Sequence, residues 1–198
     1  MITFKNLSKD IPYILFKEKY ERAESANQQN VEAMCISSYS KNTKEVNARF
    51  VNLKLVEDRN FIFFSNYESP KSRDFESHAQ ITALFYWSSI DTQIRMKANI
   101  EKTPADYNQK YFTSRDIQKN ALAISSKQSK KIASYDDVQR NYKKSLDNDD
   151  LLVCPDYWGG FKFKPYYFEF WEGHRSRLNK RIAFKIEDNN WVQNVLQP

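Results

Sequence analysis

The order of apolar and polar residues divides the chain into short strands joined by polar turns. Apolar and polar residues roughly alternate over 32–40 and 46–56, and the apolar run 61–65 follows the polar turn 58–60. Period-two alternation is typical of strands with one buried face, and short turns join antiparallel neighbours. The first part of the chain therefore predicts an antiparallel meander. Further strands are expected at 81–87, 92–102, 182–186 and 191–196, and a hairpin is expected from 161–165 and 166–171.

Helix signals separate these strands. Ile11, Ile14, Leu15 and Tyr20 fall near a 3.6-residue period, which predicts a helix over about 8–28 lying on the outside of a sheet. Other helices are expected at about 69–78, 103–113, 121–125 and 133–145. Thr103 precedes a proline in a variant of the capping-box pattern, so it is expected to cap its helix.

Composition narrows the class of protein. A chain of 198 residues with 40% hydrophobic and 15% aromatic residues predicts one folded domain over 1–198. It has no apolar run of membrane-spanning length and no signal-peptide pattern at Met1, so a cytoplasmic protein is expected. The two cysteines and two histidines lack metal-ligand spacing, so no metal site is expected.

The net charge of +6 indicates an anionic partner, either nucleic acid or a small molecule that carries phosphate. The charge is spread along the chain without a basic tail, which makes nucleic acid the weaker reading.

The stretch 168–181 carries the clearest candidate chemistry. It begins as an alternating strand, is interrupted at Gly173, and continues with Arg175, Arg177 and Arg181. Arginines beside Trp171 suit a planar, anionic, aromatic ligand, because guanidinium groups bind oxyanions bidentately and indole offers a flat apolar wall. The alternative is a solvated turn between two antiparallel strands.

This stretch resembles the C-terminal signature of the pyridoxamine 5'-phosphate oxidases. Glu169-Phe-Trp171 and Arg177-Leu-Asn-Lys-Arg181 match that signature, with Asn179 where the family has His and Lys180 where it has an acid. The resemblance implies a mainly β fold with flanking helices, an antiparallel split β-barrel of the FMN-binding type. It also implies a homodimer that binds FMN in clefts between subunits, with the signature carried by the strands at about 158–198.

The resemblance assigns Arg49 to the FMN phosphate and Lys54 to the substrate phosphate. Five residues apart, they would face opposite sides of a regular strand, so a shared site requires a bulge or a bend. Gln128 and Ser129 match a pair that reaches FMN across the dimer interface. The FMN contacts implied in all are Arg49, Phe50, Val51, Asn52, Leu53, Lys54, Phe64, Ser65, Lys71, Gln93, Gln128, Ser129, Trp171 and Arg181.

Substrate contacts are implied in the same way, at Lys54, Tyr111, Arg115, Lys119, Arg177 and Asn179. Tyr111 and Arg115 are four residues apart, so they share one helix face and can clamp a phosphate. Lys119 replaces a serine of the family. Arg177 and Asn179 are the implied catalytic pair, but an amide cannot carry a proton near neutral pH as His can, so a weaker or altered activity is expected.

The implied activity is oxidation of pyridoxamine or pyridoxine 5'-phosphate to pyridoxal 5'-phosphate, with FMN as cofactor and dioxygen as acceptor. Two alternatives remain open at this point. One is a related FMN oxidase with another substrate, as in the phenazine-pathway relatives. The other is a non-enzymatic barrel that binds flavin or nucleic acid, with bases stacking on aromatic side chains.

Overall fold

The computed structural model describes residues 1–198. Its strands are β1 (Thr3–Lys5), β2 (Ala33–Ser40), β3 (Glu45–Glu57), β4 (Asn60–Asn66), β5 (Gln80–Trp87), β6 (Thr92–Lys102), β7 (Trp158–Glu172), β8 (Lys180–Glu187) and β9 (Asn190–Leu196). Its helices are α1 (Ile11–Ser25), α2 (Pro70–Ser77), α3 (Ala105–Thr113), α4 (Ile117–Ser125) and α5 (Tyr135–Asn148), with a short 3₁₀ helix at Ser88–Ile90. The predicted meander from β2 to β4 is confirmed.

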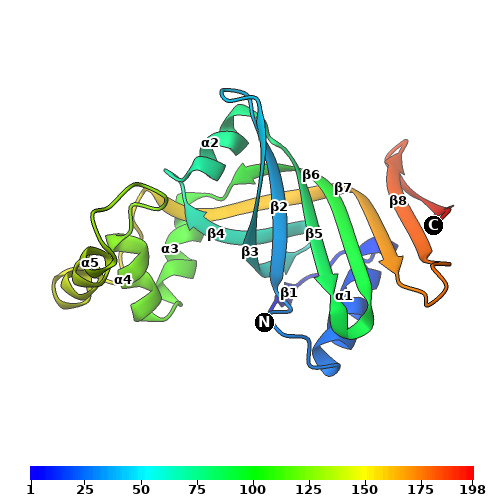
Figure 1. The fold of residues 1–198 in the computed structure, drawn as a ribbon, viewed down its shortest axis with the longest axis horizontal. Helices are drawn as coiled ribbons and strands as arrows, with labels where there is room; N and C mark the ends of the chain where they lie inside the picture. The colour runs from blue at the N-terminus through cyan, green and yellow to red at the C-terminus, as the bar shows by residue number, and fades with distance from the viewer.

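The strands form a closed antiparallel ring. Neighbouring strands pair in the order β3, β2, β5, β6 and β7, and β4 closes the ring because it pairs with both β3 and β7. Beyond the ring, β8 and β9 continue from β7, and β1 pairs in parallel with β3. Figure 1 shows α3, α4 and α5 at one end of the molecule and the β8–β9 hairpin at the other. The predicted mainly β barrel with flanking helices is confirmed.

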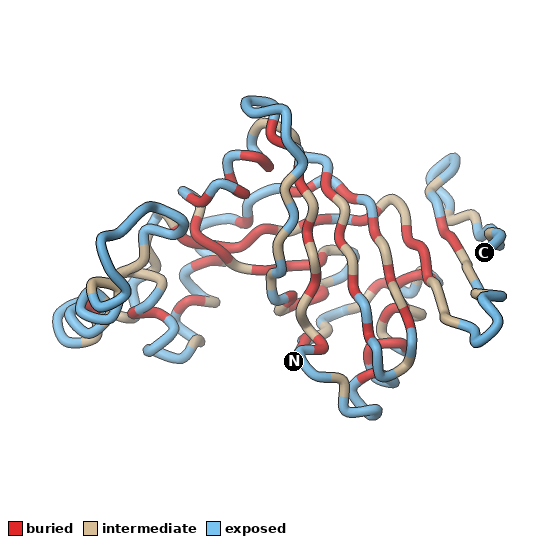
Figure 2. The backbone as a smooth tube through the Cα atoms, in the orientation of Figure 1, coloured by how far each residue is buried: buried red, intermediate tan, exposed pale blue.

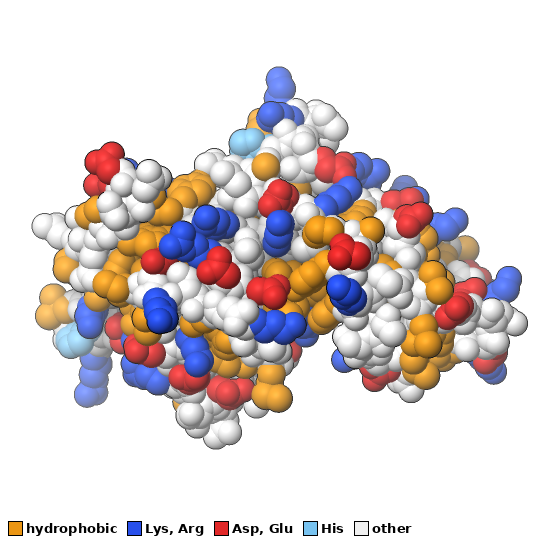
Figure 3. Space-filling view, turned by 180° about the vertical axis from the view of Figure 1, so that it is seen from behind, with side chains coloured by type: hydrophobic (Ala, Val, Ile, Leu, Met, Phe, Trp, Pro, Cys, Tyr) orange, Lys and Arg blue, Asp and Glu red, His pale blue; other side chains and the backbone are white.

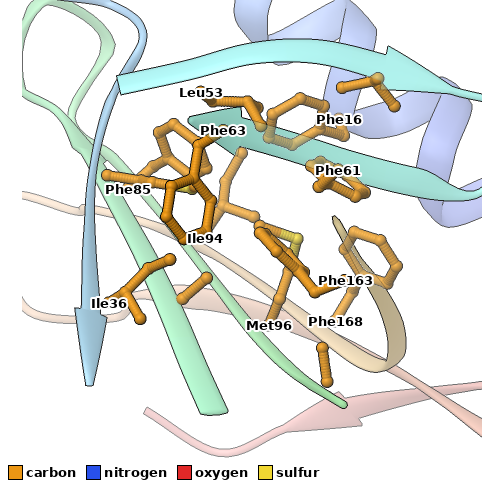
Figure 4. Close-up of a cluster of buried hydrophobic side chains, with 14 of the residues drawn as sticks. Phe16, Ile36, Leu53, Phe61, Phe63, Phe85, Ile94, Met96, Phe163 and Phe168 are labelled. Atoms are coloured by element: carbon orange, nitrogen blue, oxygen red, sulfur yellow. The ribbon is translucent and has the colours of Figure 1, made fainter. Parts of the chain in front are cut away.

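The barrel is filled largely by aromatic side chains. Phe61, Phe63, Phe85 and Phe168 are fully buried in a single hydrophobic cluster (Figure 4). Buried positions alternate along the central strands in Figure 2, as expected for strands with one face on the core. Burial of these rings is the main stabilising term of the fold.

The buried face of α1 differs from the prediction. Tyr13, Phe16 and Tyr20 are buried, whereas Ile11 and Ile14 are exposed. Phe16 packs edge-on against Phe61 and Phe85. The aromatic residues of the helix offer more apolar area than the isoleucines, and this difference decides which face turns to the core.

The predicted hairpin at 161–171 is wrong, because β7 is one continuous strand from Trp158 to Glu172. Pro165 pairs with Ala98 and Tyr167 pairs with Lys97, so Tyr166 is an extra residue in a bulge against β6. A proline has no N–H to donate, and a bulge is one of the few places where a strand accepts it. Pro165 therefore bends the strand without ending it.

Two helix starts also differ from the prediction. Thr103 does not cap α3; its hydroxyl donates to Asn108 Oδ1 at 2.5 Å, and Pro104 occupies the N-cap position. The helix expected at 121–125 begins earlier, at Ile117, where the Asp116 carboxylate accepts from the Gln118 N–H at 2.8 Å. This earlier start gives α4 the extra turn that carries Lys119.

None of the helices is both long and apolar enough to cross a membrane. Basic and acidic side chains intermingle over the face seen in Figure 3. This face therefore shows no large basic surface, and an anionic ligand would need a local cluster of cationic side chains.

Candidate active site

A cleft of about 750 Å³ lies among β3, β4, the start of α2, the α3–α4 region and the loop after α4. The predicted residues that line it are Arg49, Phe50, Val51, Asn52, Lys54, Phe64, Ser65, Lys71, Tyr111, Arg115, Lys119, Gln128 and Ser129. Five of these are cationic, and the only carboxylate in the lining is Asp116. Such an excess of positive charge suits phosphate.

A bulge in β3 lets Arg49 and Lys54 share this cleft. Leu53 pairs with Phe63 and Leu55 pairs with Ile62, so Lys54 has no partner residue on β4. An extra residue of this kind is re-aimed relative to the strand's regular alternation. The bulge expected from the five-residue spacing is therefore present, and it falls at Lys54 itself.

The first end of the cleft is built around Lys71. This side chain is buried, and its Nζ donates to Ser69 Oγ at 3.1 Å and to Gln128 Oε1 at 3.2 Å. Burial, with the charge of Arg49, lowers the pKa of Lys71 to about 8. Lys71 has no carboxylate partner, so an anion in the cleft would supply its missing counter-charge.

Arg49 lies near Lys71, and its guanidinium is held in place by Ser38 and Asp74. Its guanidinium donates to Ser38 Oγ at 2.7 Å and lies 3.5 Å from Asp74 Oδ2, while burial lowers its pKa. These contacts fix the direction of a long, flexible side chain before any ligand binds. Preorganisation of this kind reduces the entropy cost of binding.

Gln128 and Ser129 line the cleft within this chain. Ser65 Oγ donates to Gln128 Oε1 at 3.3 Å, and Asn66 Nδ2 donates to the Ser126 carbonyl at 3.4 Å. The loop after α4 is thus bound to the end of β4 within one subunit.

The second end of the cleft is built on α3 and α4. The Tyr111 ring stacks on Phe64 with centroids 3.6 Å apart and planes 3° from parallel, and the Arg115 guanidinium lies 4.4 Å from the Trp158 ring centroid. Arg115 Nη1 is buried without a hydrogen-bond partner. A buried, unpaired guanidinium N–H is costly, and an anion in the cleft would satisfy it.

Lys54 faces the same end. Its Nζ lies 3.8 Å from Glu32, and burial lowers its pKa, with the charges of Lys119 and Arg115 acting in the same direction. Burial also lowers the pKa of Arg115. Lys119 and Arg115 both disfavour the charged form of Lys54, and a bound anion would offset that repulsion.

The other predicted flavin residues form a separate row. Gln93 pairs with Trp171 and Trp171 pairs with Arg181, so these three side chains stand side by side across β6, β7 and β8. None of them lines the cleft. Trp158 does line the cleft, but it lies at the opposite end of β7 from Trp171. The two tryptophans are thirteen residues apart, which corresponds to roughly 40 Å of extended strand.

The predicted catalytic pair lies in the loop next to this row. Arg177 is exposed with φ of 60°, and Asn179 Oδ1 accepts from the His174 N–H at 3.0 Å. Neither residue lines the cleft. The Asn179 amide oxygen therefore holds the loop together in the single chain.

Two family models match separate parts of the chain. Residues 21–144 match the model described as pyridoxamine 5'-phosphate oxidase, and residues 158–198 match the one described as pyridoxine 5'-phosphate oxidase C-terminal dimerisation region. The chain belongs to the pyridoxamine 5'-phosphate oxidase family. The first match contains all the cleft residues except Trp158, which lies in the second match together with Trp171 and Arg181.

Individual members of the family are similar over nearly the whole chain. The chain is 33% identical to the pyridoxine/pyridoxamine 5'-phosphate oxidase of Herminiimonas arsenicoxydans, covering 94% of this chain and 89% of that protein. It is 34% identical to the pyridoxine/pyridoxamine 5'-phosphate oxidase 1 of Hydrogenovibrio crunogenus, covering 94% of this chain and 88% of that protein. The crystal structure of PhzG from Burkholderia lata shares the fold, with a TM-score of 0.89, 22% identity and coverage of 94% and 92%.

Sequence reasoning missed part of the cleft of this oxidase-family protein. Pro70, Ser114, Asp116 and Trp158 also line it. Trp158 had a usable signal, because it precedes Gly159-Gly160 in a recognisable motif, but only the packing shows that it supports Arg115. Leu53, in contrast, is fully buried in the core, so it can offer a ligand only its backbone.

Proposed function

We propose that the protein is an FMN-dependent oxidase that converts pyridoxamine or pyridoxine 5'-phosphate to pyridoxal 5'-phosphate, with dioxygen as electron acceptor. The observation that carries this proposal is the cleft with two cationic ends, since cofactor and substrate each bring one phosphate. Family membership supports an enzyme over a nucleic-acid-binding barrel. FMN supplies the redox chemistry when bound, and the protein binds and orients both partners.

The first end fits the FMN phosphate. Lys71 and Arg49 supply charge, while Ser65, Gln128 and Ser129 supply neutral polar groups. Lys71 is buried without a carboxylate, so the residues present fit a dianion. Pro70 stands where the family often has Arg, and the neutral groups share the phosphate oxygens that such an arginine would bind.

The second end fits the substrate phosphate. Arg115 offers its unpaired Nη1, Tyr111 its phenol, and Lys54 and Lys119 two ammonium groups. Lys119 brings a point charge on a flexible arm where the family has a hydroxyl. We infer that this substitution strengthens the attraction for phosphate and loosens its geometry.

A homodimer supplies what the single cleft lacks. The match of residues 158–198 to a dimerisation region supports a second copy whose Gln93, Trp171 and Arg181 face this cleft. In that arrangement the indole and the amide meet the flavin ring, and the partner subunit's Arg177 lies over the substrate ring. Each site then depends on two chains, and isolated monomers are inactive.

The test is a visible spectrum of the FMN-loaded protein, taken without oxygen before and after adding pyridoxamine 5'-phosphate. Bleaching of the bound flavin, with recovery in air and formation of pyridoxal 5'-phosphate, is the expected result. Failure of the protein to bind FMN at all would overturn the proposal. Bound FMN that stays oxidised with both the amine and the alcohol would overturn the substrate assignment alone.

A second candidate is an FMN oxidase with a different substrate. The observation in its favour is Asn179, whose amide oxygen is already engaged by the His174 N–H and which replaces a titratable His. On this reading the cationic end at Lys119 binds another anionic group. This candidate would be supported if an anionic reductant unrelated to vitamin B6 bleached the bound flavin while neither pyridoxamine 5'-phosphate nor pyridoxine 5'-phosphate did.

A further inference from the structure

An ion cluster with a buried carboxylate lies next to the row of Gln93, Trp171 and Arg181, on the same face of the sheet, and shares Arg181 with it. Its centre is Glu169 on β7, which is 3% exposed although it lies on the outward face of the strand, between the core residues Phe168 and Phe170. A carboxylate is seldom buried to this degree unless it is paired.

Both oxygens of the Glu169 carboxylate accept two hydrogen bonds each. Oε1 accepts from Arg181 Nε at 3.0 Å and from Arg181 Nη2 at 2.8 Å. Oε2 accepts from the Tyr167 hydroxyl at 2.9 Å and from Arg95 Nη2. Burial alone would raise the pKa of Glu169, but the donors from Arg95, Arg181 and Tyr167 lower it, so the group is a carboxylate at neutral pH.

These contacts fix the guanidinium of Arg181 in one plane. Besides the two bonds to Glu169, Nη1 donates to the Gln197 carbonyl at 2.8 Å. A guanidinium has five N–H groups, so two remain for a ligand. Arg181 is adjacent to Trp171 in the register of β7 and β8, so its position is set relative to the indole.

The second arginine decides the charge of the cluster. One carboxylate between Arg95 and Arg181 leaves a net charge of one positive unit, whereas Glu169 and Arg181 alone would be neutral. Arg95 is bonded to the oxygen that Arg181 does not use. It therefore keeps the group beside Trp171 attractive to electronegative ring atoms such as carbonyl oxygens.

We propose that Glu169 is a positioning residue for the flavin ring: it holds Arg181 in place beside Trp171, and Arg95 keeps the Glu169–Arg181 pair positively charged. This inference rests on the proposed function, because it takes FMN as the ligand. We assign the row to the flavin ring and not to the FMN phosphate. The phosphate is assigned to Lys71 and Arg49 in the separate cleft, whereas the row offers an indole, an amide and a guanidinium held in place.

The experiment measures the dissociation constants of FMN and riboflavin, by quenching of flavin fluorescence, for the full-length apo-protein and its variants. Glu169→Gln is expected to weaken both flavins about tenfold and to shift the visible bands of bound FMN. Glu172→Gln removes another ion-paired carboxylate from the same strand and is expected to leave both constants unchanged. Glu172 pairs with Lys19 at 2.7 Å, outside the cluster.

A double variant separates positioning from general stabilisation. If Glu169 acts through Arg181, then Glu169→Gln should add less than twofold once Arg181→Gln is present. Wild-type affinity in Glu169→Gln, or the same tenfold loss in the Arg181→Gln background, would overturn the inference. Failure of the wild-type protein to bind either flavin would instead overturn the proposed function.

Arg95→Gln provides a second route should Glu169→Gln not fold. Arg95 is partly exposed, with 39% of its side chain accessible, so its replacement is better tolerated. Loss of the net positive charge is expected to weaken FMN and riboflavin equally, by about threefold. Affinities equal to wild type, or a loss for FMN alone, would count against the cluster's role.

Discussion

Gln128 Oε1 lies 3.2 Å from Lys71 Nζ and joins the loop after α4 to the first turn of α2. The amide oxygen is the only long-range acceptor that this buried ammonium has, since its other bond is to Ser69 two residues away. A neutral oxygen satisfies a hydrogen bond but does not neutralise a charge. Lys71 is therefore poised for an anion, and it is the residue on which binding of the cofactor phosphate can be tested most directly.

Lys71→Met is expected to weaken FMN binding by about 1.5–3 kcal/mol, roughly 10- to 150-fold, because a charge-assisted bond to phosphate is lost. Riboflavin lacks the phosphate, so its affinity should change little. Isothermal titration of both flavins measures the contrast. Lys144→Ala, on the exposed surface of α5, is the control for charge alone. Equal losses for FMN and riboflavin would show that Lys71 acts on the ring or on folding.

The pH dependence of FMN affinity should follow Lys71. Its pKa is about 8 in the free protein, so it is charged below pH 8 and loses its proton as the pH rises. A bound phosphate favours the charged form and raises the pKa in the complex, so affinity falls above pH 8, by at most tenfold per pH unit. Titrations from pH 6.5 to 9.5 measure this fall. It should be absent in Lys71→Met; a fall of the same size in that variant would assign it to another group.

Lys119→Ser restores the hydroxyl that the family has at this position. Removal of one of the three cations at the substrate end is expected to raise KM for pyridoxamine 5'-phosphate several-fold, with FMN affinity unchanged. Salt dependence of KM should weaken in parallel, because screening acts on charge. Steady-state kinetics at two ionic strengths tests both effects. An unchanged KM would place Lys119 outside the substrate site.

Asn179→His restores the titratable group that the family has at this position. Turnover of pyridoxine 5'-phosphate is expected to rise, because imidazole can carry a proton near neutral pH and an amide cannot. The pH profile of kcat should gain a dependence near pH 6–7 that the wild-type protein lacks. A loss of turnover would show instead that the bond from the His174 N–H to Asn179 is what the loop requires.

Gly160→Ala tests a close approach beside Phe64, which lines the cleft. A Cβ at this position would lie 2.4 Å from Thr103 Oγ1 and 3.1 Å from the Phe64 ring. The expected cost is about 1–3 kcal/mol of stability, measured by chemical denaturation. Combination with Thr103→Ala should cost less than the sum of the two single variants, since the obstructing hydroxyl is gone. Strict additivity would place the strain elsewhere.

Local patterns were sufficient for most of the elements. Alternation and short apolar runs located β2 to β6, because both are properties of a few consecutive residues. The spacing of Arg49 and Lys54, together with the shared site that the resemblance implies, indicated the bulge in β3. The same local reading failed at Pro165 and Thr103. There a neighbouring strand accepts the proline at a bulge, and a helix residue, Asn108, binds the threonine hydroxyl.

The sequence by itself determined the family, the barrel class and the candidate residues, since motif residues and alternation are written along the chain. Only the tertiary structure decided how those residues are grouped. Packing of helices and loops distant in sequence brought Lys71, Gln128 and Arg115 to one cleft, and pairing of β7 with β8 placed Trp171 beside Arg181 in another row. It also buried Glu169 between Arg95 and Arg181, because side chains on three adjacent strands, β6, β7 and β8, meet only when the sheet has formed.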